Sequence, residues 1–123
     1  MSPKAKVEIA REHLVKAQDE LHGGDLRDAV QWAFASLEAA IDALAAEEGL
    51  MIDQQHWKRT DAAKELHARG VLSADFSGLH RELNFLRKAI FYDGEELETD
   101  GFSVENAVAD IETVVEIATE RAS

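Results

Sequence analysis

The residues best suited to chemistry lie in one segment, residues 79–94, which reads Leu-His-Arg-Glu-Leu-Asn-Phe-Leu-Arg-Lys-Ala-Ile-Phe-Tyr-Asp-Gly. His80, Asn84 and Arg87 recur at the spacing of one helical face and form a polar line. Such side chains can exchange protons, donate hydrogen bonds or hold an anion. We therefore expect any reactive or binding site of this chain to lie here. The alternative is that these are solvated polar residues on an amphipathic helix.

An apolar stripe beside this line predicts the helix that must position it. Leu79, Leu83, Leu86 and Ile90 follow one another at helical spacing, and Phe76 extends the stripe upstream. The pattern predicts a helix over residues 74–92, with Gly78 marking either a bend or a later start. Asp93-Gly94 is a turn pair that ends it.

Two long helices are predicted before this segment. Ser2-Pro3 is a favourable helix start, and an apolar stripe follows at Val7, Ala10, Leu14, Ala17 and Leu21. Gly23-Gly24 breaks that helix, Asp25 caps the next, and Gly49 stops it after about Glu48. The short break predicts an antiparallel hairpin.

The second long helix is apolar around most of its circumference. Its main stripe is Leu26, Val30, Ala33, Leu37, Ile41 and Leu44, and Trp32, Phe34 and several alanines widen it. Such a helix is buried on most sides. We expect a central helix that also contributes to a homodimer interface, with burial inside one chain as the alternative. Glu38 is expected to be a surface acid, or else a carboxylate turned toward Arg87.

Two further helices complete the pattern. Thr60 is predicted to cap a short helix that runs to about Ala68 and closes at Gly70. Ser103 is predicted to cap the last helix, whose stripe is Val104, Val108, Ile111, Val115 and Ala118. No useful length alternates with period two. The sequence predicts a single all-α domain over residues 1–123, an antiparallel up-and-down bundle of four main helices and one short helix.

Composition limits the kinds of function. The net charge of −12 opposes avid non-specific nucleic-acid binding, although Arg81, Arg87 and Lys88 form a local basic group. Cysteine is absent, no run approaches the ~18 apolar residues of a membrane helix, and no signal peptide is evident. We expect a cytoplasmic, acidic protein without membrane contact.

The five histidines do not form a metal motif. No His-x-x-x-His or His-Glu-x-x-His pair occurs, and the Glu-x-x-His pairs of di-iron bundles are missing. Gly23-Gly24 also lacks the continuation of a phosphate-binding loop. No metal and no cofactor are predicted.

The order of these patterns resembles a known family. The hairpin turn reads Gly-Gly-Asp-Leu-Arg-Asp-Ala-Val, and the second helix contains Ala-Phe-Ala-Ser-Leu-Glu-Ala-Ala-Ile-Asp-Ala-Leu. A short helix, Leu83-x-x-Leu86-Arg87 and a final helix follow. From about Lys6 to Ala118 the chain resembles the HEPN domains, small all-α modules common in prokaryotic toxin–antitoxin and defence systems.

The resemblance implies a site at Arg87. Active HEPN members carry an arginine, often followed by asparagine, and a histidine four to six residues beyond it; both contribute to metal-independent RNA cleavage across a dimer interface. Arg87 matches the arginine, Lys88 stands where asparagine is usual, and Tyr92 stands at the histidine position. A tyrosine with an ordinary pKa near ~10 is a poor proton shuttle at neutral pH. The site is therefore expected to be degenerate.

Several functions follow from this resemblance. The first is a homodimeric interaction or binding protein with an inactive or repurposed site, in which Arg87, Lys88, Asn84 and His80 contact an RNA or nucleotide phosphate. It could belong to a toxin–antitoxin or defence pair, with a nucleotidyltransferase-type partner protein. The alternative is a metal-independent endoribonuclease that uses Arg87 with Tyr92 or His80.

Overall fold

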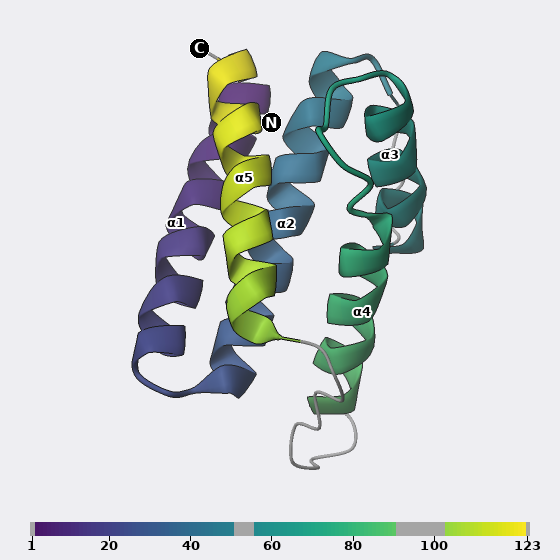
Figure 1. The fold of residues 1–123 in the computed structure, drawn as a ribbon. Coiled ribbons are helices and arrows are strands. Elements are labelled where there is room, and N and C mark those ends of the chain that lie inside the picture. The colour runs from purple at the N-terminus through teal and green to yellow at the C-terminus, as the bar shows by residue number, and fades with distance from the viewer. Residues whose placement is uncertain (1, 51–55, 91–102, 123) are drawn as a thin grey trace.

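The computed structural model describes residues 2–50, 56–90 and 103–122, which form five helices and contain no β-strand (Figure 1). These are α1 (Pro3–His22), α2 (Leu26–Glu47), α3 (His56–Ala68), α4 (Ser77–Lys88) and α5 (Val104–Ala122). The predicted all-α bundle is confirmed. None of the described helices is both long and apolar enough to cross a membrane.

The α1–α2 hairpin forms as its turn residues predict. The Ser2 hydroxyl accepts a hydrogen bond from the Ala5 amide at 3.2 Å, and the Asp25 carboxylate accepts one from the Asp28 amide at 3.0 Å. These caps satisfy amides that a helix start leaves without partners. Gly24 has a φ of 83°, which glycine adopts without strain. The two helices then run antiparallel (Figure 1).

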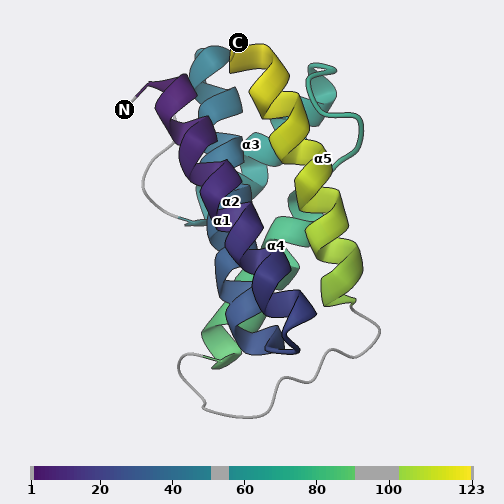
Figure 2. The ribbon, with the colours of Figure 1, turned by 90° about the vertical axis from the view of Figure 1, so that its left-hand side faces the viewer.

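α2 is the centre of the bundle and contacts each of the other four helices (Figures 1 and 2). Its buried residues, which lie on several sides, are Ala29, Val30, Ala33, Phe34, Ser36, Leu37, Ala40, Ile41, Ala43, Leu44 and Ala45. Packing within one chain therefore buries much of the wide apolar surface, as expected of a central helix. The homodimer stays a prediction.

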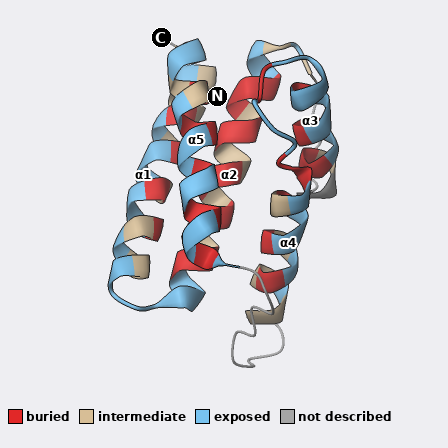
Figure 3. Ribbon diagram, viewed as in Figure 1, coloured by how far each residue is buried: buried red, intermediate tan, exposed pale blue. Residues whose placement is uncertain are grey.

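α1 and α5 cover one side of α2. The α1 stripe is buried at Val7, Ala10, Leu14 and Ala17, and the whole predicted α5 stripe is buried (Figure 3). The Ser103 hydroxyl accepts a hydrogen bond from the Asn106 amide at 3.1 Å, so the predicted cap of the last helix is confirmed.

α3 and α4 pack on another side of α2 and on each other. The predicted cap at Thr60 is wrong: α3 already begins at His56, and Thr60 lies buried inside it. α4 begins at Ser77, close to the later of the two predicted starts, because the Asp75 carboxylate accepts a hydrogen bond from the Ser77 amide at 2.9 Å. Phe76, Leu83 and Leu86 face the core as predicted.

Candidate functional site

A buried polar network joins α2, α3 and α4. We call it the His80 network; its members are Glu38 and Asp42 of α2, Arg59 and Thr60 of α3, and His80 of α4. The side chains of Glu38 and Asp42 are only 12% and 18% exposed. Buried polar groups are costly unless they are hydrogen-bonded. The network supplies those bonds and fixes three helices relative to one another.

His80 connects Glu38 and Thr60 within this network. The residue is 0% exposed; its Nε2 lies 2.9 Å from Glu38 Oε2 and its Nδ1 2.7 Å from Thr60 Oγ1. With the Glu38 carboxylate as acceptor, Nε2–H donates to Glu38, and Nδ1 shares the second hydrogen bond with the Thr60 hydroxyl. Both ring nitrogens are thereby occupied. The expected role of His80 at an RNA phosphate does not fit this position.

Arg59 holds the two carboxylates of α2 together. Its Nε and a terminal nitrogen donate to the two oxygens of Asp42 at 2.8 and 2.9 Å, and another nitrogen lies 3.6 Å from Glu38 Oε2. The hydrogen bond to Asp42 raises the pKa of the Arg59 guanidinium, as does the charge of Glu38, while burial opposes the shift. A two-pronged arginine–carboxylate pair is a strong, directional link. Glu38 is therefore not the surface acid of the first prediction, because its carboxylate contacts His80 and Arg59.

Arg87 occupies a different environment about two helical turns further along α4 than His80. A terminal nitrogen donates to Asn84 Oδ1 at 3.1 Å, and the guanidinium carbon lies 4.9 Å from the centroid of the Phe34 ring. Its Nε is buried and has no hydrogen-bond partner. By contrast, Arg11, Arg59, Arg69 and Arg121 all lie within ion-pair distance of carboxylates. Among the described residues, no carboxylate forms such a pair with Arg87.

The outer side of α4 is cationic and aromatic. Arg81 and Lys88 are exposed, and Phe85, between them in sequence, is 67% exposed. Helical spacing places Arg81, Asn84, Phe85 and Lys88 on one face, with Arg87 at its edge toward α2. We call Arg81, Asn84, Phe85, Arg87 and Lys88 the α4 cationic face.

The structure thus divides the predicted site residues. Asn84 and Arg87 are brought together at the edge of α4, Lys88 is exposed beside them, and His80 is withdrawn into the core. Tyr92 lies outside the described residues. His80, Asn84 and Arg87 do lie on one helix at the predicted spacing. That spacing did not show that His80 lies in the core while Asn84 and Arg87 lie nearer the surface.

Sequence reasoning missed three members of the network and one of the cationic face. Asp42 lies four residues after Glu38 on the same side of α2, which was a usable sign of paired carboxylates. Thr60 was predicted only as a helix cap, and no spacing in the sequence connects Arg59 with α2. Phe85 interrupts the polar pattern of α4, but its exposure could not be seen in the sequence.

One further group of carboxylates lies near the α1–α2 turn. Oxygens of Glu20, Asp25 and Asp28 all lie within 4.8 Å of one another. The Asp25 carboxylate already caps α2 through the Asp28 amide, which explains its position without an ion. This group alone does not define a metal site.

No family model matches this chain, and no curated protein matches it either. The candidate site is therefore interpreted from its own geometry.

Proposed function

We propose that this protein is a non-catalytic, HEPN-like binding protein that holds an RNA or nucleotide phosphate on the α4 cationic face. The observation that carries the proposal is the state of Arg87, whose Nε has no hydrogen-bond partner and whose guanidinium pairs with no carboxylate in the described part of an acidic chain. An arginine that rests on an aromatic ring and hydrogen-bonds a neutral amide keeps a positive charge that no described carboxylate neutralises, and such a charge attracts an anion.

The neighbours of Arg87 suit a nucleotide. Lys88 and Arg81 add positive charge, and the exposed ring of Phe85 offers a surface on which a base can stack. Stacking of a base on an aromatic side chain contributes about 1–3 kcal/mol. Since the whole chain carries a net charge of −12, binding will be local and weakened by salt. A nucleotide or a short single strand fits this small face better than a long duplex.

In this proposal His80 does not act as a general acid or base. A general acid or base must come within hydrogen-bond distance of the proton it transfers. His80 is fully buried, and both of its ring nitrogens already have partners. Its role in this proposal is to position α4 through Glu38 and Thr60.

Binding can be measured by fluorescence anisotropy with a labelled single-stranded RNA in EDTA. We expect saturable binding that Arg87→Ala and Phe85→Ala each weaken by about tenfold, a change that corresponds to roughly 1.4 kcal/mol. Lys4→Ala removes an exposed cation of α1 and serves as the matched control, with less than about a twofold effect expected. Equal losses in Arg87→Ala and Lys4→Ala would reduce the effect to total charge and overturn the proposal.

The resemblance also implies a homodimer and a nucleotidyltransferase-type partner in a toxin–antitoxin or defence pair. The exposed ring of Phe85 supports an interface on α4, because large exposed apolar side chains are enriched where proteins associate. Sedimentation equilibrium tests this part. A dimer that Phe85→Ala dissociates would support it, and a monomer at all concentrations would remove the homodimer from the proposal.

The second candidate is a metal-independent endoribonuclease that uses Arg87 with Tyr92, since His80 is buried. The positive charge of Arg87, which no described carboxylate pairs with, favours it, since a transition-state phosphate needs such a charge beside it. Wild type, Arg87→Ala and Tyr92→His are compared for RNA cleavage in EDTA. Wild-type cleavage that Arg87→Ala abolishes would establish this candidate over the binding protein. Cleavage only in Tyr92→His would show a HEPN site that one residue inactivates.

A further inference from the structure

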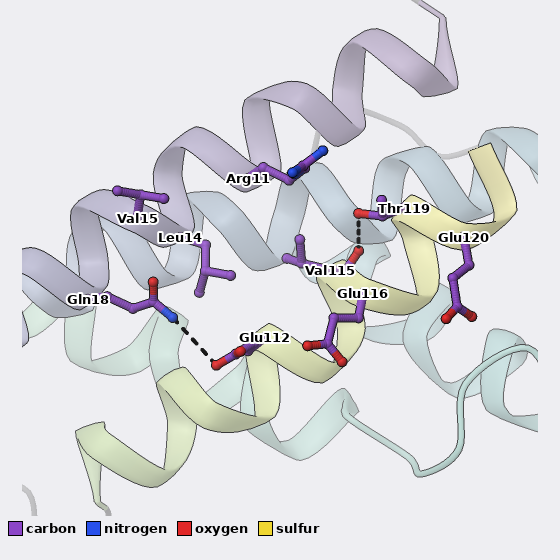
Figure 4. Close-up of a pocket in the computed structure, with 9 residues that line it drawn as sticks. All are labelled: Arg11, Leu14, Val15, Gln18, Glu112, Val115, Glu116, Thr119 and Glu120. Atoms are coloured by element: carbon purple, nitrogen blue, oxygen red, sulfur yellow. Dashed lines mark hydrogen bonds between the residues drawn. The ribbon is translucent and has the colours of Figure 1, made fainter. Parts of the chain in front are cut away.

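A groove runs between α1 and α5, on another side of the bundle than α4 (Figure 4). Its volume is about 430 Å³. Leu14 and Val115 lie between the two helices, and Val15 lies along the α1 edge. Leu14 and Val115 are buried, whereas Val15 is 54% exposed. The groove therefore has an apolar centre with one side chain that the bundle itself does not cover.

The α5 edge of the groove is acidic. Glu112, Glu116 and Glu120 follow one another at four-residue spacing, so three like charges lie in one line. Like charges at this spacing destabilise a helix. Within the described residues, neither Glu112 nor Glu116 forms an ion pair; Glu112 accepts only a long hydrogen bond from Gln18, at 3.5 Å. The cation in the lining, Arg11, lies 3.8 Å from Glu8 of its own helix. Glu112 and Glu116 thus place like charges on this edge, and no cation among the described residues forms an ion pair with either of them.

The geometry points to a docking site for a basic amphipathic helix of a partner protein. An apolar stripe on such a helix would cover Val15 and meet Leu14 and Val115, and its lysine or arginine side chains would lie along the three glutamates. This is the helix-in-groove mode of recognition, with charge complementarity at the edge. The acidic line spans about 12 Å, two helical turns, which matches two apolar anchors of the partner. Phosphate-bearing ligands are disfavoured here by the same three carboxylates.

The test uses a labelled model peptide, a lysine-rich helix of about four turns with leucines on one face. We expect saturable binding by fluorescence anisotropy, with one peptide per chain. The double variant Glu112→Gln/Glu116→Gln should weaken it at least about tenfold, and Val15→Ser about fivefold. The control Asp61→Asn/Asp110→Asn removes the same charge from exposed positions away from the groove, and should change affinity less than about twofold.

Several outcomes would overturn the inference. A peptide of the same composition with its leucines scattered must bind much more weakly; equal binding would leave only general attraction between charges. Equal losses of affinity in the two double variants would also leave only general attraction between charges. Tight binding of spermine would identify a small polycation as the ligand. Mass that rises with concentration in sedimentation, and falls in both Phe85→Ala and Val15→Ser, would show that α4 of a second copy fills the groove instead. Failure of the RNA-binding test leaves this inference untouched, because the two surfaces share no residue.

Discussion

At the scale of single residues, His80 shows how burial decides chemistry. Its imidazole could serve acid–base catalysis at a surface, but here it is fully buried between Glu38 and Thr60. A ring whose two nitrogens are both engaged cannot reach a substrate proton without breaking those bonds. The same property that makes histidine useful in active sites, a donor and an acceptor on one small ring, here joins a carboxylate to a hydroxyl.

His13 provides a test of stability against pH. Its ring packs 5.2 Å from that of Trp32, and burial, with Lys16 nearby, lowers the pKa of His13 from 6.5, while Glu12 opposes the shift. The unfolded chain then takes up a proton before the folded one does, so stability is full above about pH 6.5 and falls as the pH drops toward the lowered pKa. We expect urea unfolding to show a loss between about pH 7.5 and about pH 5.5 that is smaller in His13→Phe. An identical loss in both proteins would contradict this.

At the scale of helices, α3 depends on polar contacts as well as apolar ones. Ala62, Ala63 and Leu66 enter the core, but Arg59 and Thr60 make the specific connections to α2 and α4. A buried charge must keep its partner, since an unpaired charge in the interior is costly. The position of α3 is therefore tied to the ion pair of Arg59 with Asp42.

The replacement Arg59→Met should measure this dependence. It leaves the nearly buried carboxylates of Glu38 and Asp42 without their guanidinium, so we expect a loss of about 3 kcal/mol in the free energy of unfolding by urea. Arg69→Met is the matched control. Arg69 is 39% exposed and pairs with Glu65 of its own segment, so its loss should stay below about 1 kcal/mol. Similar losses would show that the Arg59 pair is no stronger than a surface pair.

At the scale of the whole molecule, α2 is the central helix on which two pairs of helices pack. α1 and α5 pack on one side of it, and α3 and α4 on another (Figure 3). This arrangement uses the unusually broad apolar surface of α2 inside one chain. It also leaves two separate outer surfaces, the α4 cationic face and the α1–α5 groove, with opposite charge.

Leu37 tests the central role of α2. It is 0% exposed, so Leu37→Ala should create a cavity and cost about 3 kcal/mol in the free energy of unfolding. Leu26, on the same helix and 42% exposed, is the control, and Leu26→Ala should cost less than about 1 kcal/mol. Both are measured by urea denaturation followed by circular dichroism. A larger effect at Leu26 would place it in an interface between chains.

The sequence by itself determined the helices and most of their ends. Ser2, Asp25 and Ser103 cap helices through amides only three residues away, and Gly24 and Gly49 adopt positive φ angles in the turns. Apolar spacing also identified the buried stripes of α1 and α5. These features depend on neighbours along the chain, so local patterns suffice to predict them.

Only the tertiary structure decided which polar residues are buried and which stay at the surface. His80 and its partner Glu38 are 42 residues apart, and Thr60 is 20 residues from His80. The line of His80, Asn84 and Arg87 is the same in the sequence whether it faces solvent or α2. Whether each residue of this line is buried or exposed depends on how α2, α3 and α4 pack. That packing is the sum of many contacts between residues distant in the sequence, which local spacing does not show.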